Sequence, residues 1–477
     1  MSQAATAATA PQPGGEEEII EGLIARARVA MEALADADQA RVDEAVTALA
    51  WAIYEPTRAR ELAELAVKET GLGNVESKVI KNQRKTFGAL RDLMRAKTVG
   101  VIAEDKAKGI VKYGKPVGVV AAVSPSTNPS ATPVNKAMMA IKGANAVIIA
   151  PSPAGHAPTS KTVDYMRAEL VKIGLPADLV QVLPAPVNKA LTQGLMEACD
   201  LVVVTGSQNN VRRAYSSGTP AIGVGAGNVS VIVDSSADLK DAAAKITMSK
   251  IFDNSTSCSS ENSLIILDDV YDDAIAALME NGGYRTSAEE KSKIQDTLWV
   301  DGHLNRHVIA KGADVFAVEA GLGEDAAKAA FFIVEDENPG PDTPFADEKL
   351  SLVLTVYRAS DFDDAVAQFR KIMDVCGKGH SIGIHTKDMD HANRLAEELE
   401  VVRVLVNQAH TFGTGGSFTN GLEFTLSMGC GTWAGNSISE NLNYRNFINV
   451  THLVTEIPED KPSEDELFGG HWSKFGK

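Results

Sequence analysis

Short apolar segments alternate with helical segments along most of this chain, and this alternation constrains the possible folds more than any other feature. Segments such as "KPVGVVAAVSP" (115–125), "AVIIAPSP" (146–153) and "SLIILDD" (263–269) are rich in apolar and β-branched residues. Between such segments lie patterns with apolar residues every three or four positions, which favour helices. This alternation is typical of βαβ units with parallel strands. We therefore predict an α/β fold.

The alternation is interrupted once, near residue 250, and this interruption predicts two domains. A chain of 477 residues is also too long for a single hydrophobic core. We place one open α/β domain at residues 18–245 and a second at 246–435. Residues 1–17 form a polar lead-in that we predict to be disordered, and residues 436–477 hold a further strand and a charged tail.

Charge and composition exclude several classes of protein. The net charge of −17 argues against binding to nucleic acid or to an anionic membrane surface. The N-terminus lacks the basic and apolar regions of a secretory signal, and no segment is apolar enough to span a membrane. The spacing of the four cysteines fits neither a metal site nor a disulfide framework. We expect a cytoplasmic protein without a bound metal.

One of the four cysteines, Cys258, lies in a polar loop, "FDNSTSCSSEN" (252–262), between a predicted helix and a predicted strand. Free cysteines usually pack in cores as small apolar residues. A polar, accessible setting with nearby backbone N–H groups is what a reactive thiolate requires. Cys258 is therefore a candidate nucleophile, and the alternative is an incidental loop cysteine.

Polar loops follow several strands of the first domain. Open α/β sheets bind ligands at the carboxyl ends of their strands, where loops such as "SPSTNPS" (124–130) and "TGSQNN" (205–210) would meet. "GVGAGN" (223–228) is not a dinucleotide fingerprint, because its glycine spacing differs and a strand follows it. "VVVTGSQNNVRRAY" (202–215) is the better candidate, since its helix N-terminus would face a phosphate or ribose.

Several blocks in the same order resemble the aldehyde dehydrogenase superfamily, and within it the CoA-acylating branch. The resemblance covers residues 20–455 and rests on blocks such as "PVGVVAAVSPSTNP", "GVGAGNVSVIVD", "IFDNSTSCSSENSLII", "GKGHSIGIHT" and "GCGTWAGNSISENLNYRNFIN". It implies that the first domain binds a nicotinamide dinucleotide and that the second is catalytic. It also implies an oligomerisation arm near residues 105–116 and an oligomerisation strand within residues 436–477, and hence a homodimer or homotetramer.

Carried over residue by residue, the resemblance assigns roles in the site. Cys258 is the nucleophile, and the amide of Asn128 shares an oxyanion-binding role with the backbone N–H of Cys258. Glu348 holds the nicotinamide ribose. The other positions expected to contact the cofactor are Ser124, Pro125, Ser152, Thr205, Gly206, Ser207, Gly223, Val224, Gly225 and Leu350.

One departure from the hydrolytic members predicts the second substrate. Those members carry a glutamate about 35 residues before the cysteine, where it activates water, and here that position is Gly223. The acylating branch has glycine-rich sequence at this place and uses the thiol of coenzyme A. His380 stands where that branch has a candidate general base, which a neutral histidine suits; the alternative is a structural histidine.

The resemblance leaves the cofactor and the aldehyde open. The segment "APSPAGH" (150–156) lacks the lysine and acid that hold the adenosine ribose in hydrolytic members, which favours NADP over NAD. Segments such as "PSTNPSATP" and "NGLEFTLSMGCGTW" are most similar to enzymes that act on sulfoacetaldehyde. Acetaldehyde, propionaldehyde and succinic semialdehyde are the alternatives.

A sulfonate substrate would need hydrogen-bond donors, and one loop of the sequence is a candidate source of them. The glycine-rich "HTFGTGGSFTNG" (410–421) is a candidate anion nest of backbone N–H groups with His410 beside it, or else a flexible loop. Two other functions also stay open. The chain could be a hydrolytic dehydrogenase with a different base, or a scaffold subunit that keeps the fold without turnover.

Overall fold

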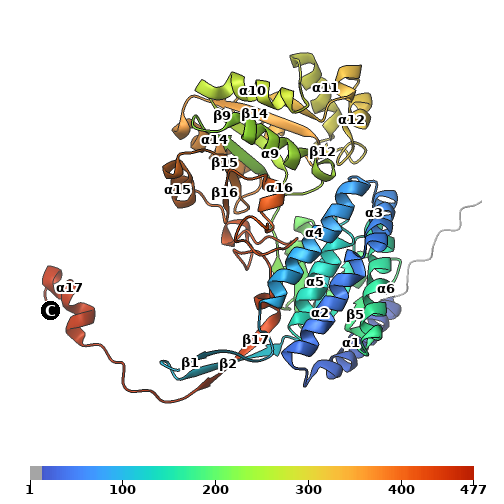
Figure 1. Ribbon diagram of the computed structural model, residues 1–477, viewed down its shortest axis with the longest axis vertical. Helices are drawn as coiled ribbons and strands as arrows, with labels where there is room; N and C mark the ends of the chain where they lie inside the picture. The colour runs from blue at the N-terminus through green and yellow to red at the C-terminus, as the bar shows by residue number, and fades with distance from the viewer. Residues whose placement is uncertain (1–12) are drawn as a thin grey trace, which may run out of the picture.

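The computed structural model describes residues 13–477 of the chain, and the first twelve residues of the predicted lead-in lie outside this range (Figure 1). The lead-in is shorter than predicted, because helix α1 (Pro13–Met31) already begins at residue 13. Proline is favoured in the first turn of a helix, and Glu16 there complements the helix dipole.

The first domain is built on a five-stranded parallel sheet in the order β5-β4-β3-β6-β7. Helices pack on this sheet, and strands β3 and β4 are buried along their whole length. The strands are β3 (Val119–Ser124), β4 (Ala146–Pro151), β5 (Val180–Val182), β6 (Leu201–Val204) and β7 (Ala221–Gly223). The helices are α1, α2 (Gln39–Tyr54), α3 (Pro56–Thr70), α4 (Val75–Met94), α5 (Ala131–Lys142), α6 (His156–Lys172), α7 (Lys189–Ala198) and α8 (Gln208–Tyr215).

The second domain is built on a seven-stranded parallel sheet in the order β10-β13-β14-β9-β8-β15-β16. Its strands are β8 (Val229–Val233), β9 (Glu261–Leu267), β10 (Gly283–Arg285), β13 (Phe331–Glu335), β14 (Val353–Ala359), β15 (Ile382–His385) and β16 (Val404–Val406). Its helices are α9 (Leu239–Ile251), α10 (Tyr271–Glu280), α11 (Ala288–Leu298), α12 (Ala313–Glu319), α13 (Glu324–Ala327), α14 (Phe362–Val375) and α15 (Met389–Glu398), and the hairpin of β11 (Trp299–Val300) and β12 (His303–Leu304) joins two of them.

The boundary between the domains lies earlier than the predicted 245/246. Strand β8 pairs with β9 and β15 in the second sheet, and helix α9 packs with α10 beside it. The change of sheet therefore falls between Gly223, at the end of β7, and Val229. The sequence placed the boundary too late because it followed the interruption at the cysteine loop near residue 250. The pattern of strands and helices does not show which sheet a strand such as β8 joins.

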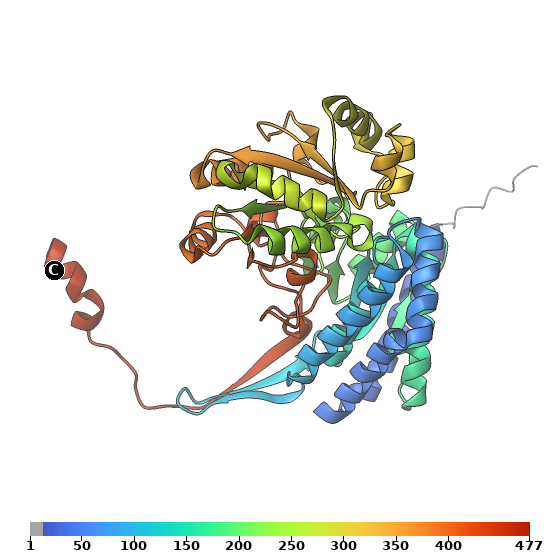
Figure 2. The same ribbon diagram turned by 45° about the horizontal axis from the view of Figure 1, so that its top comes forward.

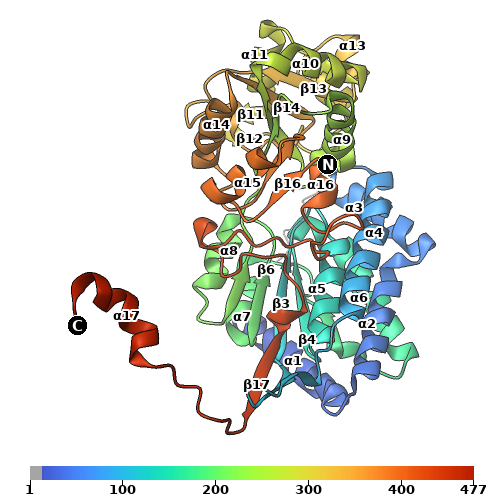
Figure 3. The ribbon, with the colours of Figure 1, turned by 60° about the vertical axis from the view of Figure 1, so that its left-hand side comes forward.

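A three-stranded antiparallel arm projects from the first domain (Figure 2). It consists of β1 (Gly100–Asp105), β2 (Ile110–Pro116) and β17 (Ile448–Val454), so it starts before the predicted residue 105. Strand β17 pairs with β2 along its whole length. The C-terminal helix α17 (Glu464–Phe475) follows and stands apart from both domains (Figure 3). Within residues 13–477, no helix combines the length and apolar character that a membrane crossing needs.

Candidate active site

A cavity of about 420 Å³ lies where the two sheets approach each other. Its wall includes the three candidate catalytic residues, Cys258, Asn128 and His380. It also includes most positions expected to contact the cofactor: Pro125, Thr205, Gly206, Ser207, Val224, Gly225, Glu348 and Leu350. The sequence analysis therefore predicted correctly that residues up to 255 positions apart in the chain line one pocket.

Cys258 is held at the amino end of β9 by a strained turn. The short helical segment η4 (Phe252–Ser255) connects α9 to the cysteine loop, and Asp253, Asn254 and Ser255 all have positive φ angles of 52 to 57°. Non-glycine residues in this region cost energy and persist where surrounding contacts hold them. Buried Asp253 provides those contacts, because its carboxylate accepts from Lys78 at 3.1 Å and from Lys81 at 2.6 Å.

The backbone at Cys258 is shaped for an incoming negative charge. No acceptor in the described part of the chain bonds to the Cys258 backbone N–H, which is therefore free to donate to a ligand. Gly227 packs directly against this residue, and a Cβ there would lie 2.1 Å from the Cys258 carbonyl oxygen. A side chain at position 227 would thus displace Cys258, the candidate nucleophile.

The Asn128 amide is oriented by a charged neighbour. Lys81 Nζ donates to Asn128 Oδ1 at 2.8 Å while it also binds Asp253. With its oxygen occupied in this way, the amide turns its NH₂ group away from Lys81, and that group makes only a 3.5 Å contact with the Thr127 hydroxyl. Asn128 can therefore donate into the cavity, as an oxyanion-binding group must.

The Cys258 thiol is protonated in the free protein at neutral pH. Burial and the charge of Glu348 raise its pKa to about 12, while Lys81 acts in the opposite direction. Glu348 is itself shifted, because burial and neighbouring Asp347 raise its carboxyl pKa to about 8. The half-buried thiol of Cys258 is thus less acidic than the sequence suggested, and attack requires that its proton be removed.

His380, the candidate general base, lies on the cavity wall and is neutral. It is buried, and burial followed by repulsion from Arg403 lowers its pKa well below the usual value for histidine. Its Nδ1 contacts the Ser381 hydroxyl at 2.7 Å, and its Nε2 has no partner within residues 13–477. One ring nitrogen is thus oriented by the protein and the other is left without a hydrogen bond, an arrangement suited to taking up a proton.

The carboxyl edge of the first sheet fits a polar cofactor. Thr205 to Ser207 follow β6 and line the cavity, and Ser207 caps α8 through its side chain. No acceptor in the described residues bonds to the backbone N–H groups of Gln208 and Asn209, in the first turn of this helix. Free N–H groups at a helix N-terminus favour phosphate or another anion. These residues would hold a dinucleotide at this edge.

Three predicted cofactor contacts lie outside the cavity wall. Ser152 caps a turn with its hydroxyl, which accepts from Gly155 N, and Ser124 is buried at the end of β3. Gly223 is buried at the end of β7, where a Cβ would lie 2.5 Å from Val211 Cγ1 and 3.2 Å from the Tyr215 ring. Position 223 thus has no room for the glutamate of hydrolytic members unless these two side chains move.

Sequence reasoning missed one wall of the cavity, which is formed by helix α4. Ile80, Lys81, Arg84 and Lys85 all line the pocket. The three basic residues are spaced i, i+3 and i+4, which places them on one face of the helix. This spacing was visible in the sequence, but a solvent-exposed charged face has the same spacing.

The glycine-rich loop at 410–421 does not form the anion nest considered above. Most of its backbone N–H groups bond within the protein; for example, Thr411 N donates to Ser249 Oγ and Thr414 N donates to His410 O. Two of its carbonyls, those of Phe412 and Gly415, instead accept from cations of α4. Buried His410 contacts the Ser259 carbonyl oxygen and the Thr414 hydroxyl, and burial lowers its pKa to about 3.

Together, two parallel sheets, a cysteine between them and a polar carboxyl edge define a dinucleotide-dependent enzyme with a cysteine nucleophile. Residues 2–287 match the model of the aldehyde dehydrogenase family. The chain belongs to this family.

Known proteins similar over nearly the whole chain agree with this assignment. An acylating sulfoacetaldehyde dehydrogenase of Cupriavidus necator is 52% identical over 99% of this chain and 96% of its own length. One from Bilophila wadsworthia is 43% identical over 94% of this chain and 98% of its own. The crystal structure of an acetylating aldehyde dehydrogenase from Geobacillus thermoglucosidasius, 32% identical, superposes with a TM-score of 0.90 over 94% of this chain and 99% of that one.

Proposed function

We propose that this protein oxidises sulfoacetaldehyde to its acyl-CoA, using coenzyme A as the acyl acceptor and NAD or NADP as the oxidant. The observation that carries the proposal is the arrangement around Cys258, which joins a free backbone N–H, the oriented Asn128 amide and a position 223 with no acid. Similarity to acylating sulfoacetaldehyde dehydrogenases over nearly the whole chain supports the choice of aldehyde.

The first half of the reaction forms an acyl-enzyme. Neutral His380 takes the proton of the Cys258 thiol and passes it to solvent. The Cys258 thiolate then adds to the aldehyde carbon, and the carbonyl oxygen becomes an oxyanion that the Cys258 N–H and the Asn128 amide stabilise. A bound nicotinamide supplies an acceptor for the hydride that leaves this carbon. Loss of the hydride turns the adduct into a thioester on Cys258.

The second half transfers the acyl group. Neutral His380 takes the proton of the CoA thiol, whose sulfur then attacks the thioester carbon. The same two donors stabilise the second oxyanion, and its collapse expels the Cys258 thiolate and releases acyl-CoA. Water competes poorly, because the position that holds a general base in hydrolytic members is the sterically closed Gly223.

We propose that the protein uses NAD or NADP as its cofactor and that it favours NADP. No carboxylate follows β4 in the segment 150–156, where an acid would select the ribose hydroxyl of NAD and repel a 2′-phosphate.

The nucleophile must also stay a free thiol, and a reducing, cytoplasmic setting protects it.

Steady-state turnover tests the proposal. The purified protein is given sulfoacetaldehyde or acetaldehyde, NAD or NADP, each with and without CoA, and cofactor reduction is followed. We expect continuous turnover only with CoA, a higher kcat/KM for sulfoacetaldehyde than for acetaldehyde, and a higher kcat/KM for NADP than for NAD. Equal rates without CoA would make water the acceptor, and no turnover under any condition would favour a scaffold role.

We also propose a homodimer or homotetramer assembled through the arm. Among residues 13–477, strand β17 pairs with β2 alone, and its residues are mostly exposed, so its other edge is available to a second copy. Light scattering after size-exclusion chromatography tests this proposal. A monomeric mass at micromolar concentration would contradict it.

A further inference from the structure

Helix α4 brings positive charge into the active-site cavity of an otherwise acidic protein. Lys81, Arg84 and Lys85 line the same cavity as Cys258, whereas the whole chain carries a net charge of −17. An anion that enters this cavity must therefore be attracted by local groups. The three cations differ in how many hydrogen-bond and ion-pair partners the protein gives them.

Lys81 already has protein partners. Its ammonium binds the buried Asp253 carboxylate at 2.6 Å and the Asn128 carbonyl oxygen at 2.8 Å. These contacts give it a role in the turn and in the amide orientation described above. Lys81 is thus not the group that awaits a ligand.

Lys85 and Arg84 have only uncharged acceptors. Lys85 Nζ donates to the Gly415 carbonyl at 2.7 Å, and Arg84 Nη2 donates to the Phe412 carbonyl at 3.2 Å and to Ser417 Oγ at 3.3 Å. Within residues 13–477 no carboxylate lies within the 4.0 Å of a salt bridge to either side chain. An ammonium has three N–H donors and a guanidinium five, so both retain free donors.

The surroundings of these two cations are partly apolar. The Lys85 ammonium lies 5.6 Å from the Phe424 ring centroid, and the Arg84 guanidinium carbon lies 5.2 Å from that of Phe412. Aromatic walls lower the local dielectric and strengthen attraction to an anion. They also leave the cations poorly solvated, a state that a bound anion relieves.

Lys85 lines the same cavity as the sulfur of Cys258, the reacting atom. Burial, followed by the charges of Arg84 and Lys81, lowers the Lys85 pKa to about 7, and the charge of Cys258 acts in the opposite direction. Gly415 makes this position possible, because a Cβ there would lie 2.7 Å from Lys85 Nζ. A charge held beside the nucleophile suits a substrate whose anionic group is only a methylene away from its aldehyde carbon.

We propose that Lys85, supported by Arg84, forms the subsite that binds the anionic group of the aldehyde substrate. The inference rests on the proposed function and assigns the residues that would select a sulfonate over an uncharged chain. The Lys85 ammonium donates its free N–H groups to the sulfonate oxygens, and Arg84 adds positive charge behind it. The loop carbonyls at residues 412 and 415 hold both side chains in place.

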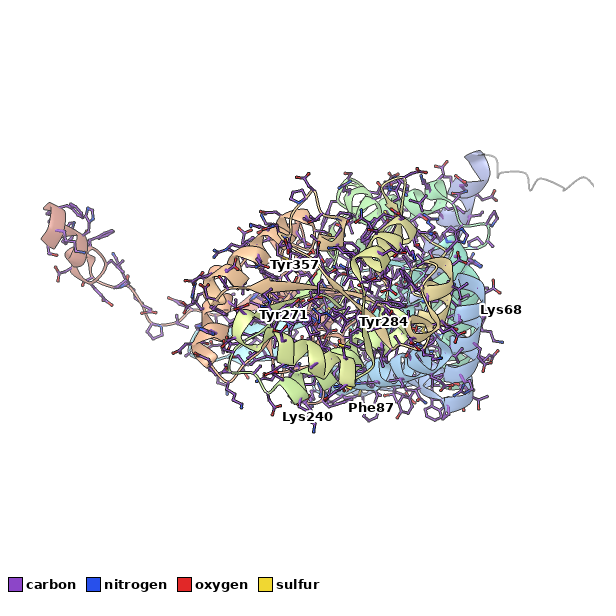
Figure 4. The ribbon with its side chains drawn as sticks, turned by 90° about the horizontal axis from the view of Figure 1, so that it is seen from above. Lys68, Phe87, Lys240, Tyr271, Tyr284 and Tyr357 are labelled. Atoms are coloured by element: carbon purple, nitrogen blue, oxygen red, sulfur yellow. The ribbon has the colours of Figure 1, made fainter. Side chains whose placement is uncertain are left out.

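A comparison of two aldehydes of similar size tests the subsite. Sulfoacetaldehyde carries a sulfonate where propionaldehyde carries a methyl group, so the ratio of their kcat/KM values measures recognition of the charge. We expect Lys85→Met to lower this ratio about 100-fold, as loss of a charge-assisted contact in a desolvated site does. Lys85→Arg restores the ratio to within tenfold of wild type. Lys68→Met, on the exposed face of α3 (Figure 4), is the matched control and leaves the ratio unchanged.

An unreactive probe separates failure of the subsite from failure of the proposed function. Ethanesulfonate is tested as a competitive inhibitor of propionaldehyde turnover, with 1-propanol as the uncharged control. Inhibition by ethanesulfonate that Lys85→Met weakens supports the subsite even if sulfoacetaldehyde is not turned over. Equal inhibition of wild type and Lys85→Met, no inhibition at all, or a parallel loss of kcat/KM for both aldehydes in the variant, would overturn it.

The pH dependence of this inhibition gives a further readout. Above about pH 7 the wild-type Lys85 loses its proton, so ethanesulfonate inhibition weakens as the pH rises. Arg84 and Lys81 face the same space as Lys85. The guanidinium of Arg84 stays charged, the Cys258 thiol titrates far higher, and Glu348 turns anionic above about pH 8. Lys85→Arg keeps its charge and retains only the Glu348 effect. A wild-type pH profile identical to that of Lys85→Arg would contradict the role of Lys85.

Discussion

The two parallel sheets reach the same cavity from opposite ends of their strands. The first sheet contributes its carboxyl edge, where the loops after β3 and β6 carry Asn128 and Thr205. The second contributes its amino edge, since Cys258 lies just before β9 and His380 just before β15. Open α/β sheets ordinarily bind ligands at carboxyl ends, so only the first domain follows the rule.

This difference follows from the hydrogen-bonding groups that each edge supplies. Helix N-termini follow the strands at a carboxyl edge, and they supply free N–H groups such as those of α8 without any charged side chain. At the amino edge of a parallel sheet, helix C-termini come before the strands, so helix N-termini do not supply donors there in the same way. The second domain therefore holds its nucleophile with a positive-φ turn, tied by the buried contact of Asp253 with Lys78 and Lys81. We call the carboxyl edge of the first sheet the binding edge and the amino edge of the second sheet, with Cys258, the chemical edge. The binding edge also contributes one catalytic group, the amide of Asn128.

Removal of the nucleophile should break the chemical edge and spare the binding edge. We expect Cys258→Ser to lower kcat by at least about 10⁴-fold, because a hydroxyl at this position is a much weaker nucleophile than a thiolate. Isothermal titration should still detect the dinucleotide with a Kd within a few-fold of wild type. A variant that loses both properties would mean that the two edges are not separable.

Removal of the side-chain oxyanion donor has the next largest effect. Asn128→Ala is expected to lower kcat by about 10²- to 10³-fold, the usual cost of losing one preorganised donor. Lys81→Met, which frees the Asn128 oxygen, should lower kcat by a smaller factor in stopped-flow measurements of cofactor reduction. In the double variant the two losses should combine to less than their product, because part of the Lys81 effect acts through Asn128 and only the rest through Asp253. A full product would mean that Lys81 acts only through Asp253.

The charge that ties the turn should matter for stability as much as for rate. Asp253→Asn keeps a residue type tolerated at positive φ and leaves two buried lysines without a counterion. We expect the free energy of unfolding in urea to fall by about 3 kcal/mol. Asp268→Asn, which removes an exposed ion pair with Arg358, is the control and should change it by less than about 1 kcal/mol. Equal losses in the two variants would contradict the anchoring role of Asp253.

The binding edge is tested by a smaller change. Ser207→Ala removes the cap of α8 and should raise the Kd of the dinucleotide about fivefold, the equivalent of about 1 kcal/mol for an N-cap. Alkylation of Cys258 by iodoacetamide reports on the chemical edge, and its rate should change less than the Kd does. A larger effect on alkylation than on dinucleotide binding would reverse the proposed division between the edges.

The smallest expected effect concerns the influence of the Glu348 carboxylate on the Cys258 thiol. The Glu348 charge raises the Cys258 pKa, so Glu348→Gln should increase the thiolate fraction and speed alkylation severalfold above about pH 8. Below that pH, Glu348 is protonated in the wild type too, and the two rates should converge. Glu337→Gln, at an exposed position, is the control. Slower alkylation of Glu348→Gln would mean that Glu348 acts as a base toward the thiol.

The sequence predicted those parts of the fold and site that local pattern or resemblance encodes. Most strands of both sheets were visible as apolar runs, but the short edge strands β7 and β10 were not. Cys258, Asn128 and His380 share one cavity. It did not predict the wall formed by α4, because Arg84 and Lys85 on a helix have the spacing of any solvated face. Nor did it predict that Gly223 and Ser152 lie outside the cavity wall, since adjacency in the chain does not fix which way a residue faces.

The arm has a consequence for the order in which the protein is made. Asn449 in β17 contacts Pro116 in β2 across 333 residues of chain. At typical rates of synthesis on the ribosome, roughly 20 to 70 s pass between the emergence of the two strands. During that interval β2 offers an unpaired edge to any neighbouring nascent chain. Termination directly after Phe447, which keeps the core residues of the first domain, would therefore leave β2 with an unpaired edge that β17 covers in the full chain.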